Sequence, residues 1–168
     1  MNKIILNKHE IQIIEGDLIS ENSKIAIVIP RFNNFINQNL LNGAIDILIR
    51  IGKIKNKNIT IIKIPGSYEI PIILNNISSF LNYDGIITLG TIIKGETEHF
   101  KVLSSNITSK ISEISLKNNI PISLGILMTD TIEQAINRSG LKFGNKGSEA
   151  ALVVLEMINI IKKIKNKN

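Results

Sequence analysis

Residues 85–100 read GIITLGTIIKGETEHF, and this stretch decides the fold. Its first five residues form a short apolar run, which predicts a buried β-strand that ends at a glycine. The following residues, 90–100, hold two glycines, Lys94, hydroxyl groups and His99, one of 2 histidines in the chain. A strand that breaks into hydrogen-bond donors, a cation and an imidazole is typical of a reaction site in an α/β protein. The alternative is a solvated loop whose histidine has no function.

Apolar runs alternate with segments of helical periodicity on both sides of this stretch. The order strand, helix, strand with short connections predicts a parallel sheet covered by helices on both faces, a three-layer α/β/α sandwich. The strands are apolar throughout, as expected when neither face of the sheet meets water. The four predicted strands cover residues 24–30, 59–64, 85–89 and 121–128. The predicted helices cover residues 36–51, 70–81, 102–117, 132–137 and 148–164.

The chain is expected to form one domain over residues 1–168, because no linker or composition break divides it. Residues 1–23 precede the first strand and form an N-terminal arm, which we expect to pack on a neighbouring subunit. Within the arm, residues 11–16 are predicted to add an edge strand, either to this subunit's sheet or to a neighbour's. The last helix is apolar around most of its circumference, so it is buried by a second subunit or deep within its own domain.

The composition excludes several classes of function. The chain has no cysteine, which excludes disulfides and thiolate catalysis. Its two histidines, His9 and His99, lie far apart, so no metal site is expected. No apolar run is long enough to span a bilayer, and the first residues lack the layout of a secretory signal. We therefore expect a cytoplasmic protein that does not bind membranes.

The net charge of +6 suggests a nucleic-acid partner, but the distribution of residues argues against one. Aromatic residues make up only 4% of the chain, and no basic stripe alternates with stacking rings. Much of the positive charge lies in residues 53–57 and 162–168, which is typical of solvated turns and chain ends.

Ligands of open parallel sheets bind outside the carboxyl ends of the strands, and unusual loops follow several predicted strands here. Residues 31–33, RFN, follow the first strand with an aromatic ring that can stack on a planar ligand or cover the sheet. Residues 65–69, PGSYE, follow the second with backbone donors, a second ring and a carboxylate; a capped turn is the alternative. Arg138 precedes a glycine-rich connection and is suited to phosphate, although a solvated cation is the alternative.

Two common nucleotide-binding motifs are absent from these loops. Residues 140–147 lack the lysine-hydroxyl ending of the phosphate loop, and no glycine fingerprint follows the first strand. The residues themselves therefore indicate a small phosphorylated substrate, a planar partner and proton transfer by histidine, without naming a reaction.

Together these loops closely resemble those of the lumazine synthase family. The resemblance covers residues 25–160, and the motifs occur in the family's order. The matching motifs are RFN at 31–33, PGSYEIP at 65–71, LGTIIKGETEHF at 89–100, EQA at 133–135 and GNKG at 144–147.

The resemblance implies a flavodoxin-like fold and the penultimate reaction of riboflavin biosynthesis. In that reaction, 5-amino-6-(D-ribitylamino)uracil condenses with 3,4-dihydroxy-2-butanone 4-phosphate to give 6,7-dimethyl-8-ribityllumazine, with release of phosphate and water. Neither a metal nor an organic cofactor is implied. A flavin-binding module and a shell-forming relative without catalysis are the alternatives.

The resemblance also implies roles for individual residues. His99 corresponds to the acid/base group. Arg138 of an adjacent subunit completes the phosphate site, and Leu124 stands where that neighbour commonly supplies a phenylalanine beside the pyrimidine. The residues expected to hold the substrates are Phe32, Ser67, Tyr68, Glu69, Thr91, Ile92 and Ile93 for the uracil and Glu96 and Thr97 for the phosphate-bearing substrate.

The family's assemblies imply a homo-oligomer, either a pentamer, a pair of pentamers or a shell of sixty subunits. Riboflavin synthase is the protein partner that the resemblance suggests. Because the site is shared between subunits, a monomer is expected to be inactive.

Overall fold

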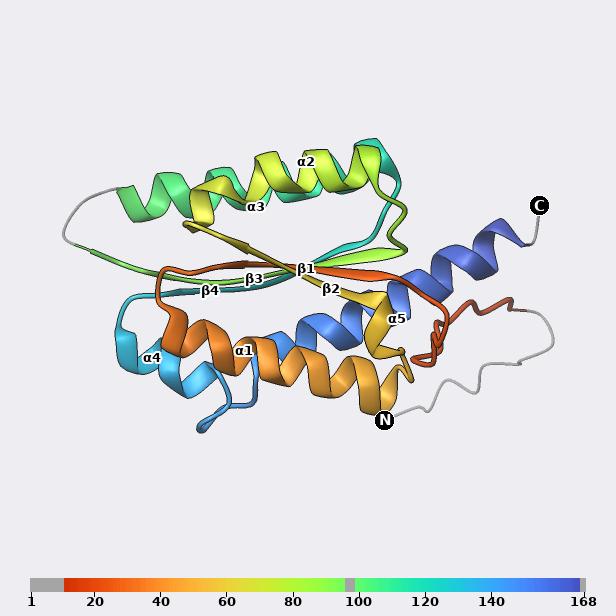
Figure 1. Cartoon of the computed structure of the whole chain (residues 1–168), viewed down its shortest axis with the longest axis horizontal. Helices are drawn as coiled ribbons and strands as arrows, with labels where there is room; N and C mark the ends of the chain where they lie inside the picture. The colour runs from red at the N-terminus through yellow and green to blue at the C-terminus, as the bar shows by residue number, and fades with distance from the viewer. Residues whose placement is uncertain (1–10, 96–98, 167–168) are drawn as a thin grey trace.

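Four parallel strands form the middle layer of the structure, in the order β2-β1-β3-β4 (Figure 1). The computed structural model describes residues 11–95 and 99–166. The strands are β1 (Ile25–Pro30), β2 (Ile59–Ile64), β3 (Gly85–Ile93) and β4 (Ile122–Thr129).

Helices cover both faces of this sheet (Figure 1). On one face lie α2 (Ile70–Phe80) and α3 (His99–Asn118). On the other lie α1 (Asn34–Asp46), α4 (Ile132–Arg138) and α5 (Lys146–Lys165). The predicted flavodoxin-like sandwich with a four-stranded parallel sheet is thus confirmed. Among the helices described, none is long and apolar enough to cross a membrane.

Strand β1 shows why an apolar run of the sequence forms a central strand of the sheet. All six of its residues are buried. Its side chains alternate between the two cores: Ile25 and Ile27 pack in the core with α1 and α5, whereas Ala26 and Val28 pack in the core with α2 and α3. A strand buried on both faces needs apolar residues at every position, which is the pattern that the sequence shows.

Strand β3 continues past its predicted end. The sequence predicts that it stops at Leu89, but it runs on to Ile93 because β4 pairs with it in register as far as Thr129. Gly90 is a strand breaker by local preference, and pairing with the neighbouring strand overrides that preference.

Two helix boundaries differ from the prediction by more than two residues. Helix α1 ends at Asp46, and the predicted remainder forms a π-helical turn over Ile47–Ile51. Helix α3 begins at His99 and not at residue 102. The histidine therefore opens a helix, whereas the sequence pattern predicts a loop there.

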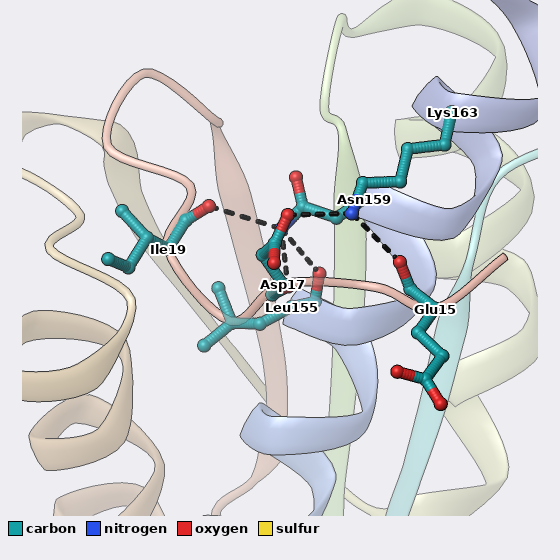
Figure 2. A network of polar contacts seen from close by, with 6 residues as sticks. All are labelled: Glu15, Asp17, Ile19, Leu155, Asn159 and Lys163. Carbon is teal, nitrogen blue, oxygen red and sulfur yellow. Dashed lines mark hydrogen bonds and ion pairs between the residues drawn. The ribbon is translucent and has the colours of Figure 1, made fainter. Parts of the chain in front are cut away.

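The N-terminal segment packs on this chain's own α5 (Figure 2). The Asn159 amide donates to the carbonyl oxygens of Asp17 at 2.6 Å and Ile19 at 3.1 Å. The Lys163 ammonium donates to the Glu15 carbonyl at 2.9 Å and pairs with the Asp17 carboxylate at 2.8 Å. Residues 11–16 form no strand within this chain. Their pairing with a neighbouring subunit stays a prediction.

Helix α5 is buried on one side only. Val154, Leu155 and Ile158 are buried in the core, whereas Val153 is 50% and Met157 39% exposed. The helix is therefore not buried around its whole circumference within this chain, and its burial by a second subunit stays a prediction.

Candidate active site

A notch opens at the carboxyl edge of the sheet because β3 is longer than its neighbour β1. The two strands pair only as far as Val28 and Thr88, whereas β3 and β4 pair as far as Ile93 and Thr129. Beyond Thr88, β3 therefore has a strand partner on one side only among the described residues. This is the edge at which parallel sheets bind ligands.

A cavity of about 470 Å³ occupies this notch. It lies among the loops after β1 and β2, the end of β3 and the first turns of α3. Its volume is within the range of small-molecule sites. The residues that line it are Phe32, Asn33, Ser67, Thr91, Ile92, Ile93, Gly95, Phe100 and Leu103.

Five of the residues predicted to hold the uracil meet in this cavity. They are Phe32, Ser67, Thr91, Ile92 and Ile93, which come from three separate stretches of the chain. Phe32 lines the cavity and is 72% exposed, so a planar ligand can reach the face of its ring. Ile92 is buried, and it gives the cavity an apolar side. An exposed ring with apolar surroundings is suited to a flat heterocycle.

The loop after β2 forms a short 3₁₀ turn over Ser67–Glu69 that leads into α2. The Glu69 carboxylate accepts a hydrogen bond from the Gly66 N–H at 2.9 Å, so it caps this turn. Tyr68 is 72% exposed and does not line the cavity. Of the three residues, Ser67 alone borders the cavity, and the substrate contacts of Tyr68 and Glu69 stay predictions.

Thr91 is bound more tightly into the protein than the sequence suggests. Its side chain is almost fully buried, and its hydroxyl donates to the Asn37 Oδ1 at 2.7 Å. Its carbonyl oxygen accepts from the Asn33 amide at 3.0 Å. Asn33 adopts a left-handed backbone with φ 57°, a conformation that asparagine tolerates better than most residues. Thr91 thus ties the loop after β1 to β3.

The loop between β3 and α3 is described only in part. Glu96 and Thr97, predicted for the phosphate-bearing substrate, lie outside the described residues. Lys94 forms an exposed ion pair with Asp130 at 3.6 Å. His99, the predicted acid/base group, is the first residue of α3. The next residue, Phe100, lines the cavity.

Arg138 and Leu124 do not lie in this cavity. Arg138 stands at the end of α4 and borders a second cavity of about 560 Å³, together with Phe143, Lys146 and Glu149. Lys146 pairs with the Glu149 carboxylate at 2.9 Å there. Leu124, on the edge strand β4, borders a third hollow against α3. Within one chain, the two residues that were predicted to act from an adjacent subunit therefore lie apart from the residues of the first cavity.

Several cavity residues were not predicted as site residues. Asn33, Gly95, Phe100 and Leu103 line the first cavity, and Asn37 lies buried behind it. The sequence does mark Asn37 as unusual, because this polar residue stands in helical register with the buried Leu41 and Ala44, on the face of the helix that is otherwise apolar. No cluster of three acidic, histidine or cysteine side chains suited to a metal ion occurs in the described part of the chain.

The fold and the site together define a three-layer α/β protein with a cavity at the carboxyl edge of its sheet, of a size and lining suited to a small planar ligand. The family model described as 6,7-dimethyl-8-ribityllumazine synthase matches residues 22–162. The chain belongs to this family.

Individual relatives extend over nearly the whole chain. A 6,7-dimethyl-8-ribityllumazine synthase of Blochmanniella pennsylvanica is 56% identical over 156 residues, which cover 93% of this chain and 99% of the relative. The protein of the same name from Wigglesworthia glossinidia brevipalpis is 59% identical over 150 residues, 89% of this chain and 97% of the relative. One from Yersinia pestis is 50% identical over 153 residues, 91% of this chain and 98% of the relative.

Proposed function

We propose that this chain is an enzyme that condenses 5-amino-6-(D-ribitylamino)uracil with 3,4-dihydroxy-2-butanone 4-phosphate to form 6,7-dimethyl-8-ribityllumazine. The observation that carries the proposal is the cavity beside β3, in which the exposed Phe32 ring faces a space of about 470 Å³ in a chain of this family. A non-catalytic relative is not favoured, because the relatives over most of the chain carry the name of the synthase.

The uracil substrate stacks on Phe32 and lies along the end of β3. Ser67 and the turn with Tyr68 and Glu69 hold its ribityl chain. Residues 91–93 contact it through the strand end, where β3 has no strand partner on the β1 side within residues 11–95 and 99–166. Backbone donors and acceptors on that side can pair with the ring's carbonyl and N–H groups.

The phosphate-bearing substrate binds between Glu96 and Thr97 of one subunit and Arg138 of the next. Arg138 is exposed and stands at a cavity that holds a second cation, Lys146. A guanidinium suits a phosphate because it donates two parallel hydrogen bonds. Leu124 of the neighbouring subunit lies beside the pyrimidine.

His99 moves protons during the reaction. The substrate amine adds to the ketone, and loss of water gives an imine. Loss of a carbon-bound proton then expels phosphate and leaves an enol, which becomes a second carbonyl. The other amine attacks this carbonyl, and loss of a second water closes the ring. An imidazole can both accept and donate protons near neutral pH, and holding both substrates in register supplies much of the remaining rate.

The active form is a homo-oligomer, a pentamer or a shell of sixty subunits, in the cytoplasm. Two features support a shared site: the residues of each half border separate cavities, and α5 leaves Val153 and Met157 exposed. Riboflavin synthase, which consumes the product, is the proposed protein partner.

The direct test mixes the purified protein with both substrates and follows lumazine absorbance and phosphate release together. We expect acceleration over the uncatalysed mixture, with equal amounts of the two products. Phe32→Ala should weaken use of the uracil substrate, whereas Phe35→Ala is the matched control, because Phe35 is also exposed but does not line the cavity. Absence of acceleration would refute the proposed activity.

A further inference from the structure

We infer that Asn37 is a positioning residue, which fixes the loop carrying Phe32 against β3 and thereby sets the orientation of the Phe32 ring. The inference deepens the proposed function, on which it rests, because it concerns how the stacking ring is held for the uracil substrate. Asn37 does not line the cavity and acts through its neighbours.

Asn37 is fully buried, and its side chain makes three hydrogen bonds. The amide nitrogen donates to the carbonyl oxygens of Pro30 at 3.0 Å and Phe32 at 2.7 Å. The amide oxygen accepts from the Thr91 hydroxyl at 2.7 Å. One planar group thus joins both ends of the turn after β1 to the end of β3.

The other sides of the same turn are held by backbone contacts. The Arg31 N–H donates to the Ile64 carbonyl at 2.8 Å, and the Phe32 N–H donates to the Pro65 carbonyl at 3.3 Å. The Phe32 peptide is therefore fixed between the end of β2 and the side chain of Asn37. The second bond is long, so Asn37 carries the shorter of the two restraints on this residue.

The Asn33 amide also ties this loop to β3, through the Thr91 carbonyl at 3.0 Å, but little holds the Phe32 ring itself. With 72% of the residue exposed, few side chains pack against the ring. Its direction is then set by the backbone from which it projects. A ring that stacks on a ligand loses affinity when its plane tilts or shifts, and a displacement of about 1 Å can cost on the order of 100-fold in rate.

Only an asparagine-like group satisfies this arrangement. An aspartate at position 37 would turn a carboxylate toward two carbonyl oxygens, and an alanine would leave the Pro30 and Phe32 carbonyls without the donor that they share. The alternative is that Asn37 merely fills the core. The two roles differ in what they do to Phe32, so they can be separated.

The kinetic test compares Asn37→Ala with Gln38→Ala, the next residue, whose amide donates only to Asn42 on the same helix. We expect Asn37→Ala to raise KM for the uracil substrate about tenfold and to leave KM for the phosphate-bearing substrate within about twofold. In a Phe32→Ala background the same change should have little further effect. An equal rise in both KM values, or the same effect with and without Phe32, would overturn the inference.

A second test needs no activity, so it separates failure of this inference from failure of the proposed function. The chain has no tryptophan, so Phe32→Trp introduces a single tryptophan at the ring position, which can be excited selectively over the two tyrosines. We expect its steady-state anisotropy to fall when Asn37→Ala is added and to stay unchanged with Gln38→Ala. Unchanged anisotropy with Asn37→Ala would contradict the positioning role.

Should Asn37→Ala fail to fold, Thr91→Val keeps the shape of the side chain and removes only the hydroxyl that donates to Asn37. We expect it to lower the anisotropy of the Phe32→Trp reporter in the same direction by a smaller amount, and Thr91→Ser to restore it. If valine and serine give the same anisotropy, the hydroxyl does not hold the loop and the network is wrong.

Discussion

Gly147 allows α1 and α5 to approach each other closely. A Cβ atom on this residue would collide with the Leu40 carbonyl oxygen, which is backbone and cannot rotate away. The contact fixes the start of α5, where Asn145 caps the helix by accepting from the Gly147 and Ser148 N–H groups. The position of Lys146 at the second cavity therefore depends on the absence of a side chain at residue 147.

We expect Gly147→Ala to destabilise the protein. Alanine favours a helix over glycine by about 1 kcal/mol, but overpacking against fixed backbone costs about 1–3 kcal/mol or more. The measurement is the free energy of unfolding by denaturant. Gly95→Ala is the control, since a Cβ atom there would have no neighbour within 4 Å, and it should leave that free energy nearly unchanged. Equal values for the two variants would contradict the close contact.

Replacement of His99 should affect the chemical reaction and not the structure of the protein. His99→Ala should slow turnover by about 100-fold or more, the usual contribution of a general acid or base, while the assembly stays intact. The checks are kcat with both substrates saturating and the mass of the particle in solution. Turnover equal to that of the unchanged protein would remove the acid/base role.

At the residue scale, the sequence predicted Phe32, Ser67 and the end of β3 in one site, and the cavity brings these together. It did not predict the three hydrogen bonds of the buried Asn37 side chain. The Thr91 hydroxyl that bonds to it is 54 residues away along the chain. A polar residue on a buried helical face signals a partner, but only the fold shows which carbonyls and hydroxyl it meets.

Apolar runs located all four strands of the sheet. The central strand β1 is buried and apolar at every position, whereas the edge strand β2 is partly exposed and carries Lys63 within its apolar run. The ends of the elements were harder to predict. Strand β3 passes through Gly90 because β4 supplies hydrogen bonds there, and the π-helical turn over Ile47–Ile51 follows no local signal that distinguishes it from α-helix. Boundaries depend on neighbours that are distant in sequence.

Two side chains of α5, Asn159 and Lys163, hold the N-terminal segment against this helix. Asn159→Ala should loosen residues 15–19 from the helix, because it removes the donor for two exposed backbone carbonyls, each hydrogen bond contributing about 0.5–1.5 kcal/mol. A glutamate-specific protease should then cleave after Glu15 faster. Lys163→Met should also speed cleavage, because it removes the donor to the Glu15 carbonyl together with an exposed ion pair that contributes about 0–1 kcal/mol.

The matched control is Asn76→Ala, whose amide donates only to the Ile72 carbonyl within its own helix α2. Cleavage after Glu15 should not change in this variant. If Asn76→Ala also speeds cleavage after Glu15, then a general loss of stability, and not loss of the contact with α5, exposes the segment.

For the whole molecule, the two separated cavities allow a complementation test. Phe32→Ala and Arg138→Ala change different cavities, and each should reduce activity strongly by itself. When the two are refolded together in equal amounts, about one quarter of the sites between adjacent copies should combine two intact halves and regain activity. Mixing after separate assembly is the control. Lack of recovery in the refolded mixture would mean that one chain supplies the whole site.

The unequal lengths of β1 and β3 have a consequence for thermal behaviour. Past Thr88, the β1 side of β3 forms no further strand pairing among the described residues, so the proposed uracil substrate would cover strand backbone that no other strand pairs with. Ligand binding and thermal stability are then linked, because whatever binds only the folded chain raises its melting temperature. Even an unreactive uracil should raise the melting temperature, and the rise would report occupancy without any chemistry taking place.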